Sequence, residues 1–471
     1  MIFLITSIFS CKNSWLLKRI KNAANLGHFP LKKGFIMKHA GTLLSCLVLL
    51  VFTNCSKNPA STVQTPGLPF AVAKSASVVR ETAPVDPTLL NAQAESNNRF
   101  AVALYKKLIT GNSNLFFSPY SMTMALAMAT AGAAGATDSA IRQALSVTLS
   151  GDDFHAALNA IDLSLMGYVK SAPGITLNVV NSAWCQTGWD FRISYLDKLS
   201  RYYGAGVNLL DFATNPENSR LVINTWVGDQ TNQKILDLLP PGSITDMTRL
   251  VLTNAVYFFG SWLDHFDSSL TKNRGFTTDT GTVTAPIMQL GQTGNSVKMI
   301  YSQNDDARAI EFPYAGNRLT MTVLLPDYGK FAMYENALSF ETIMSLINWL
   351  DSTQLPPVLF PRFQFTTGSL SLVPGLEALG MENAFNPASA DFSGIDGRRD
   401  LYIKDVFHKA YISVNERGTE AAAATGVIMP PVGMEKPKQF YATSPFIFMI
   451  RDRQTNVILF MGRIMDPTKS E

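Results

Sequence analysis

The order of the hydrophobic patterns along this chain constrains its fold more than any other feature. From residue 89 to residue 231 apolar residues recur mainly at helical spacing, with one clear strand pattern at 177–186. From residue 250 onward strand patterns dominate, and only short helical pieces lie between them. Helices followed by many strands indicate an α+β fold rather than alternating βαβ units. After residue 89 there is no internal repeat and no further change in composition. We therefore expect one large domain at residues 89–467.

The individual elements follow from the same patterns and from their capping residues. Ser118-Pro119 is expected to open one helix, and Thr137-Asp138 to cap the next. Helical patterns cover residues 91–109, 122–130, 139–145, 152–169, 194–203, 216–231, 340–350 and 370–379. Strand patterns cover residues 177–186, 250–260, 283–290, 297–301, 307–312, 319–325, 358–365, 401–415, 446–450 and 457–463.

The composition excludes several classes of protein. With 46% apolar and 16% charged residues, the chain is neither disordered nor a solvating tail. Its 39 basic and 36 acidic residues give a net charge of +3, too little for a nucleic-acid partner. No uncharged apolar stretch beyond residue 60 reaches the 18 or so residues of a membrane helix, so the body is not a membrane bundle.

A targeting segment is predicted at the N-terminus. Residues 37–55 read MKHAGTLLSCLVLLVFTNC, a basic start followed by an apolar run at 43–52. This is the pattern of a secretory signal, and the run is too short to span a bilayer comfortably. We assign residues 1–36 to an upstream extension and 37–54 to a signal peptide. The protein is therefore expected to be exported, as a lipoprotein of the cell envelope or as an extracellular protein.

Cysteine positions suggest a lipid anchor and no disulfide. Cys55 lies where a bacterial lipoprotein signal carries its acylated cysteine, although Phe52-Thr53-Asn54 lacks the usual small residue before it. Cys46 is the alternative acylation site, and a plain secretory signal is the other alternative. Cys185 lies in a buried-strand pattern and is expected to be an inert core residue. Membrane contact would then occur only through the N-terminal lipid, with residues 55–88, rich in Ser, Thr, Ala and Pro, as a tether.

The motifs of common enzyme classes are absent from the sequence. It contains no G-x-S-x-G elbow, H-E-x-x-H helix, P-loop or G-x-G-x-x-G. The segment 151–155, GDDFH, could be read as a metal cluster, but acidic residues at a helix start are better explained by the helix dipole. His408 lies on a strand pattern and is expected to be a hydrogen-bonded core histidine. We expect no catalytic residue, no metal and no cofactor.

Residues 417–439 carry no stable secondary-structure pattern although they lie between two strands. Ala421–Ala424 could propagate a helix, but the flanking glycines make it marginal in water. One interpretation is a linker or frayed helix. The other is a loop kept small so that it can move between packed elements, with Pro430, Pro431 and Pro437 holding its distal part extended.

The segment 415–426, NERGTEAAAATG, resembles the hinge of the serpins, in which a glutamate and then Gly-Thr-Glu precede a run of small residues. The resemblance extends over the whole body, with every motif in order. The other matching segments are NLFFSPYSMTMALA at 114–127, INTWVGDQTNQKILDLL at 223–239, LVLTNAVYFFGSWLDHF at 250–266, DFSGI at 391–395, VFHKA at 406–410, SPF at 444–446 and FMGR at 460–463. The chain is identified as a member of the serpin family.

This resemblance implies a serpin fold with three β-sheets, eight or nine helices and an exposed reactive-centre loop at 417–439. It also implies a monomeric suicide inhibitor of proteases rather than an enzyme. A serine protease cleaves the loop and forms an acyl-enzyme, and the freed part of the loop then inserts into the largest sheet. Insertion distorts the protease active site before deacylation, which needs the oxyanion hole and the base in register. The native state must therefore be metastable.

The resemblance also assigns site residues. The hinge comprises Glu416, Gly418, Thr419, Glu420, Ala421, Ala422, Ala423 and Ala424. A polar cluster beneath the sheet, where its strands part, comprises Ser118, Ser121, Asn254 and His408. The point at which the loop first enters is marked by Trp262 and Glu416. Arg417, where the family often has Glu or Lys, and Asn415 are mild departures from the family pattern.

The target is the least constrained feature. Counting seventeen residues from Glu416, as in the family, places the scissile bond between Val432 and Gly433, with Met434-Glu435 as the alternative. A small apolar Val432 suits elastase-like pockets, so elastase- or chymotrypsin-like serine proteases are expected. Papain-like cysteine proteases, which also form an acyl-enzyme, remain an alternative target. A non-inhibitory serpin that acts as a binding protein is the other alternative.

Overall fold

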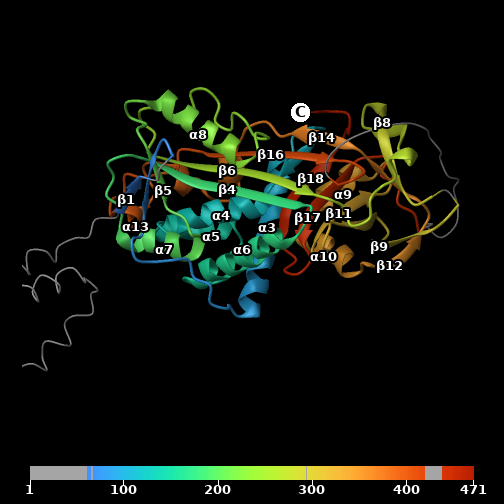
Figure 1. Ribbon diagram of the computed structural model, residues 1–471, viewed down its shortest axis with the longest axis horizontal. Coiled ribbons are helices and arrows are strands. Elements are labelled where there is room, and N and C mark those ends of the chain that lie inside the picture. Colours follow the sequence, from blue (N-terminus) through green and yellow to red (C-terminus); the bar gives the residue numbers. More distant parts are fainter. Residues whose placement is uncertain (1–60, 65–66, 293, 419–437, 471) are drawn as a thin grey trace, which may run out of the picture. The chain divides into compact units, whose positions relative to one another are not determined.

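The largest β-sheet forms the framework of the molecule. The computed structural model describes residues 61–64, 67–292, 294–418 and 438–470, all within the compact unit 60–471. Two long antiparallel strands, β4 (Ile175–Gln186) and β6 (Leu250–Gly260), occupy the centre of this eight-stranded sheet (Figure 1). The strand order is β1 (Ser61–Gln64), β2 (Ala71–Lys74), β5 (Val207–Leu210), β4, β6, β16 (Val406–Val414) and β14 (Phe363–Thr366), and β15 (Leu370–Ser371) also pairs with β16.

Two smaller sheets complete the β-structure. The seven-stranded sheet has the order β12 (Asp351–Leu355), β9 (Val297–Gln303), β10 (Ala307–Pro313), β11 (Leu319–Pro326), β17 (Phe446–Asp452), β18 (Ile458–Ile464) and β3 (Leu115–Phe117). The three-stranded sheet has the order β13 (Val358–Pro361), β8 (Gly281–Leu290) and β7 (Lys272–Thr278). Residues of β11, β17 and β18 are buried throughout, which explains why these strands are mostly apolar rather than alternating.

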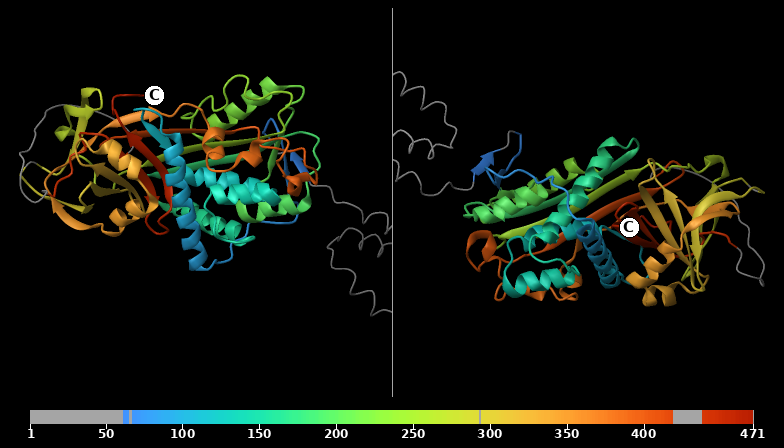
Figure 2. Two further views of the ribbon diagram at one scale, coloured as in Figure 1. Left: turned by 180° about the vertical axis from the view of Figure 1, so that it is seen from behind. Right: turned by 90° about the horizontal axis from the view of Figure 1, so that it is seen from below.

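Helices cover both faces of the large sheet. One face carries α3 to α7, and the opposite face carries α8 (Pro216–Gln230), as Figures 1 and 2 show. The remaining helices are α3 (Pro87–Leu108), α4 (Pro119–Thr130), α5 (Gly135–Ala144), α6 (Asp153–Ser171), α7 (Ile193–Tyr203), α9 (Phe331–Ala337), α10 (Phe340–Asn348), α11 (Val373–Glu377), α12 (Glu382–Phe385), α13 (Ser393–Asp396) and the 3₁₀ turn η1 (Ser268–Leu270). A second, smaller core lies between α8 and the sheet.

Helix α4 illustrates how the sequence sets local structure. The Ser118 side chain caps it by accepting a hydrogen bond from the Ser121 N–H, and Pro119 occupies the first helical position. Every residue of α4 is buried, as its mainly apolar sequence predicts. The cap residues are therefore fixed in the interior, directly beneath the large sheet.

The α+β fold is confirmed. The described part contains eleven α-helices, and eight of them, α3 to α10, have seven or more residues, compared with the eight or nine that the resemblance implies. Among the described residues, no helix combines the length and apolar character that a membrane span requires.

Several expectations about individual elements are wrong. The predicted helix at 370–379 begins with the strand β15, and its helical part is only α11. The strand predicted at 401–415 begins only at Val406. Helix α5 begins at Gly135 rather than after a cap at Thr137-Asp138, because the extended backbone of Ala134 precedes it. The single strand predicted at 358–365 is two strands in different sheets, which separate at Arg362. The tether predicted at 55–88 does not extend over that whole range, because β1 and β2 belong to the large sheet and α3 begins at Pro87.

Candidate functional site

Strands β6 and β16 are parallel neighbours at the middle of the large sheet. Their register has six pairs, from Leu252↔Val406 to Tyr257↔Tyr411. Beyond the last pair β6 continues to Gly260 and β16 to Val414, and the described residues show no further pairing between the two strands. We call the paired stretch the seam. The two strands therefore part at the end of the seam that leads to residue 418.

Four polar residues predicted to cluster beneath the sheet do lie together at the seam. His408 and Asn254 are direct cross-strand partners, and their Nδ1 and Oδ1 atoms are 2.5 Å apart. Asn254 Nδ2 donates to Ser121 Oγ at 2.7 Å, and the Ser118 N–H donates to His408 Nε2 at 3.3 Å. All four are buried. The cluster thus joins both strands of the seam to the first turn of α4.

His408 is held as a neutral imidazole. Its Nε2 accepts a hydrogen bond from a backbone N–H, so Nδ1 carries the proton and donates to Asn254 Oδ1. Complete burial lowers the pKa of His408 to about 3. Protonation of Nε2 would place its N–H against the Ser118 N–H, which is also a donor. The hydrogen-bond network and the burial therefore both favour the neutral imidazole.

Asn181 of β4 is a member of this cluster that the sequence analysis did not single out. Its Oδ1 accepts hydrogen bonds from Asn254 Nδ2 at 2.7 Å and from Ser121 Oγ at 2.8 Å. Asn181 and Asn254 face each other across β4 and β6. Asparagine is depleted in strands, so an asparagine within the strand pattern 177–186 was a signal for Asn181, although Asn178 in the same strand carries the same signal.

The chain crosses the top of β6 at Gly418. The Trp262 N–H donates to the Arg417 carbonyl at 3.0 Å, and the Trp262 indole N–H donates to the Asn415 carbonyl at 2.7 Å. Gly418 has φ +152°, and a Cβ built on it would lie 2.2 Å from the Gly260 carbonyl oxygen. Only glycine fits this approach between two backbones. The first bend of the predicted hinge is therefore fixed by a steric requirement.

Glu416 is the buried charged residue of this region. Thr271 Oγ1 donates to its Oε1 at 2.6 Å, and an Arg362 guanidinium N–H donates to the same atom at 2.5 Å. Burial alone would raise the pKa of Glu416, but these two hydrogen bonds outweigh it, and the pKa lies below its usual value. Arg362 sits where the expected single strand divides, so that break places the cation beside Glu416.

The connection between α8 and β6 crosses the seam. Asn178 Nδ2 of β4 donates to the Gln230 carbonyl at 3.0 Å, and Lys409 Nζ of β16 donates to the Leu236 carbonyl at 2.9 Å. Ser369 Oγ donates to the Leu238 carbonyl at 2.5 Å. Because these contacts lie on both sides of β6, they must be released or rearranged before β6 and β16 can separate.

Other predicted residues lie outside the described residues or away from the seam. Those outside are Cys55, Thr419, Glu420, Ala421, Ala422, Ala423, Ala424, Val432, Gly433, Met434 and Glu435. Cys185 is buried in β4, and burial raises the pKa of its thiol to about 12, which suits an inert residue. His155 packs in the interior with Nδ1 2.5 Å from Tyr203 Oη. In the described ranges no group of three or more His, Cys, Asp or Glu residues could hold a metal ion.

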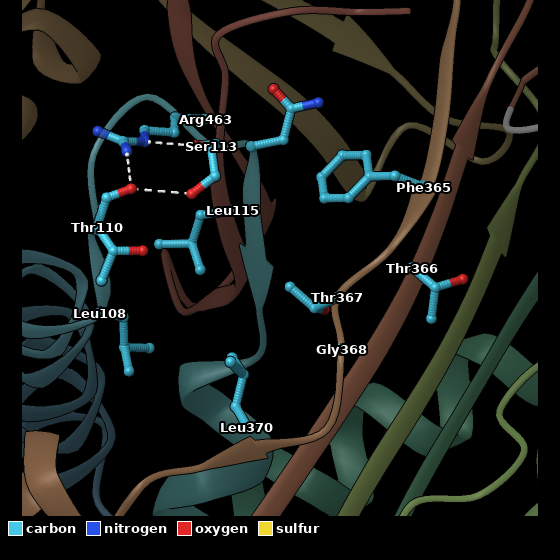
Figure 3. Close-up of a pocket in the computed structure, with 11 residues that line it drawn as sticks. Leu108, Thr110, Ser113, Leu115, Phe365, Thr366, Thr367, Gly368, Leu370 and Arg463 are labelled. Carbon is cyan, nitrogen blue, oxygen red and sulfur yellow. Dashed lines mark hydrogen bonds between the residues drawn. The ribbon is translucent and has the colours of Figure 1, made fainter. Parts of the chain in front are cut away.

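A cavity of about 150 Å³ lies between the end of α3 and the segment after β14 (Figure 3). Arg463 closes its polar side through hydrogen bonds to the carbonyls of Ser113 at 3.0 Å and Thr110 at 3.4 Å. The same guanidinium pairs with Glu335 at 2.8 Å. The charge of Arg463 is therefore neutralised inside the protein, and the cavity is lined by both apolar and polar side chains.

Comparisons with known proteins agree with this architecture. The family model described as "Serpin (serine protease inhibitor)" matches residues 95–467. An uncharacterized serpin-like protein of Thermococcus kodakarensis is 41% identical over 375 residues, which cover 79% of this chain and 84% of the relative. Serpin B6 of Pongo abelii is 37% identical, with 80% of this chain and 100% of the relative covered.

Solved structures give the same result. The thermophilic serpin tengpin in its native state superposes with a TM-score of 0.69 at 27% identity, covering 84% of this chain and 99% of tengpin. Uncleaved ovalbumin superposes with a TM-score of 0.69 at 25% identity, covering 80% of this chain and 100% of ovalbumin. With the family model matching most of the chain and the three sheets arranged as the motifs imply, this chain belongs to the serpin family.

Proposed function

We propose that this protein is a suicide inhibitor of serine endopeptidases, which traps its target as an acyl-enzyme by inserting the cleaved loop between β6 and β16. The observation that carries the proposal is the seam. Two parallel strands are paired over six registers and part at one end, where Gly418 starts the hinge. A strand entering between them from this end would run back along the seam from Gly418, antiparallel to both β6 and β16.

Insertion would be energetically favourable for a physical reason. A new central strand gains backbone hydrogen bonds on both sides, on the order of ten, each contributing about 0.5–1.5 kcal/mol net. The polar cluster supports this proposal because Asn181, Asn254 and His408 can exchange hydrogen-bond partners as β6 and β16 separate. The intact protein would thus be metastable, with the sheet held closed until the loop is cut.

The proposed targets are elastase- or chymotrypsin-like proteases. This rests on the loop sequence Met429-Pro430-Pro431-Val432-Gly433, in which the scissile bond is assigned to Val432-Gly433, with Met434-Glu435 as the alternative. Neither Arg nor Lys lies beside the assigned bond, so trypsin-like proteases are disfavoured.

A panel of proteases tests the proposed function. The purified protein is mixed with elastase, chymotrypsin, subtilisin and papain, and adducts that survive boiling in detergent are sought on a gel. We expect adducts with elastase or chymotrypsin, and none when the protease nucleophile has been blocked beforehand. An adduct with papain alone would move the target class to cysteine proteases. Cleavage without any adduct across the panel would contradict inhibition and favour a non-inhibitory binding protein.

The position of the protein in the cell is a separate proposal. The signal pattern at 37–54 followed by Cys55 supports export and acylation of Cys55, with the domain held near a membrane by its lipid. Intact-mass measurement after detergent extraction should give a chain that begins at Cys55 and carries acyl groups. An unmodified chain that begins elsewhere would leave simple secretion as the explanation.

A further inference from the structure

Residues 67–81, which precede the first helix, are fastened along one edge of the domain. We call them the N-terminal strap. Its strand β2 pairs with β5 in the register Ala71↔Leu209 to Ala73↔Val207. The approach is close, since a Cβ built on Gly206 would lie 2.5 Å from the Ala73 carbonyl oxygen. The composition of this segment, which is rich in small and polar residues, by itself predicts a tether. In the structure, however, the segment is docked closely against β5.

The first fastening point is Phe70, whose side chain is only 4% exposed. Its ring meets Trp184 of β4 edge-to-face with centroids 4.8 Å apart and lies 6.5 Å from Trp226 of α8. The two indoles are 5.2 Å apart. Phe70 therefore belongs to the core that holds α8 on the sheet, and this core also contains Ala255 of β6 and Phe407 of β16. Aromatic pairs of this kind contribute more than their buried area alone.

The second fastening point is Arg80. Its Nη2 pairs with Asp162 Oδ2 of α6 at 2.6 Å, and its Nε donates to Asn159 Oδ1 at 2.8 Å. Asp162 in turn accepts a hydrogen bond at 2.8 Å from Tyr120 of α4. Tyr120 is the immediate neighbour of Ser121, which belongs to the polar cluster at the seam. The strap is thus linked to the helix that supports the seam.

We infer that the N-terminal strap is a fastening that restrains the opening of the large sheet, with Phe70 and Arg80 as positioning residues that act through α8 and α4. The inference rests on the proposed function, because opening of the seam matters only if a strand enters there. Its physical basis is that Phe70 packs on the helix that covers the sheet and Arg80 reaches the helix beneath the cluster, so undocking the strap loosens both.

Amide hydrogen exchange of the intact protein tests the inference without any protease. Phe70→Ala removes the ring, and Gly206→Ala displaces β2 while leaving the strap sequence unchanged. Both variants should raise exchange across α8 about tenfold or more relative to wild type, and Phe70→Leu should restore part of the protection. The matched control is Val79→Ala, because Val79 lies in the same strap with 83% of its surface exposed. It should leave α8 unchanged.

Arg80 should give a different pattern of exchange. Arg80→Ala should increase exchange in the first turns of α4 and in the middle of α6 rather than in α8, since Asp162 loses its cationic partner and Tyr120 donates to that carboxylate. If Phe70→Ala and Gly206→Ala both fold and α8 exchanges as in wild type, the strap does not restrain α8 and the inference is wrong.

A second readout connects the strap to the loop. After nicking by a protease that is not trapped, the rate of strand insertion is followed by intrinsic tryptophan fluorescence, and Phe70→Ala should insert about tenfold faster than Val79→Ala. Equal insertion rates in the two variants, with α8 loosened in Phe70→Ala, would mean that the strap does not restrain the opening of the sheet, and the inference would be wrong. If no variant inserts at all, the proposed function fails, whereas the exchange comparison still decides whether the strap restrains α8.

Discussion

Gly418 lies so close to β6 that its side-chain hydrogen cannot be replaced without movement of the chain. In Gly418→Ala, the new Cβ would meet the Gly260 carbonyl, and φ +152° would be strained as well. We expect loss of the Trp262–Arg417 hydrogen bond and a thermal midpoint lower by a few degrees. The control is Gly167→Ala, at an exposed helical position with nothing within 4 Å of the added Cβ. A wild-type midpoint for Gly418→Ala would show that the hinge does not pass where the structure places it.

Buried histidines make stability depend on pH. Burial lowers the pKa of both His155 and His408 to about 3, whereas an unfolded histidine has a pKa near 6.5. Between these values the unfolded chain binds more protons, so the free energy of unfolding should fall as the pH falls below about 6.5. Each histidine should contribute a slope of up to about 1.4 kcal/mol per pH unit.

His155→Phe should remove one of these two contributions. We expect the slope of the free energy of unfolding between about pH 5.5 and 4.5 to decrease by up to about 1.4 kcal/mol per pH unit in denaturant titrations. Phenylalanine can keep the ring contacts with Phe154 and Tyr202. A substitution at the exposed His265 serves as the control. An unchanged slope in His155→Phe would indicate that this ring is already protonated in the folded protein.

At the scale of elements, the account depends on Thr419 being the first residue to enter between β6 and β16. Thr419→Arg should convert an inhibitor into a substrate, because the guanidinium would be buried without a partner, which costs several kcal/mol. Insertion competes with deacylation, and each 1.36 kcal/mol slows it about tenfold. Gel analysis with the trapped protease should show complete cleavage, no adduct and active protease.

The matched control for this variant is Thr280→Arg, which adds the same charge at the exposed turn between β7 and β8. It should form adducts as wild type does. Adduct formation by Thr419→Arg at the wild-type ratio would mean that the hinge register, and with it the assignment of Val432, is wrong.

The central elements could be predicted from sequence because each carries its own periodicity. Residues 250–260 are apolar almost throughout and form β6 with the predicted bounds. Helices α7 and α8 likewise begin and end within one residue of expectation. In these elements burial and local pattern agree, so no tertiary information was needed.

The features that were missed depend on contacts between distant residues. Strand β2 has no strong pattern of its own and becomes a strand by pairing with β5, more than 130 residues later. Arg362 interrupts the predicted strand 358–365 and pairs with Glu416, a partner 54 residues away in the sequence that no local pattern indicates. The polar cluster was assigned through the family resemblance. Asn181 was not assigned, because the residues around it in the sequence do not indicate its hydrogen-bond partners on β6 and α4.

For the molecule as a whole, the account predicts that the intact fold is not its most stable state. The seam holds β6 and β16 together through six register pairs and the His408–Asn254 hydrogen bond, while the sheet could accept another strand between them. Under the proposed mechanism, cutting the loop would free this segment to enter the sheet. Stability should therefore increase after cleavage, which is the reverse of the usual effect of proteolysis.

The most direct measurement is the thermal midpoint before and after a single cut in the loop near Val432. A zinc metalloprotease is suitable for the cut, because it uses an activated water and forms no acyl-enzyme to be trapped. The account predicts a rise of tens of degrees, far beyond the few degrees per kcal/mol that a substitution produces in a domain of this size. The thermal midpoint of Thr419→Arg should rise much less after the same cut. Equal midpoints for nicked and intact wild-type protein would contradict strand insertion and the inhibitory mechanism built on it.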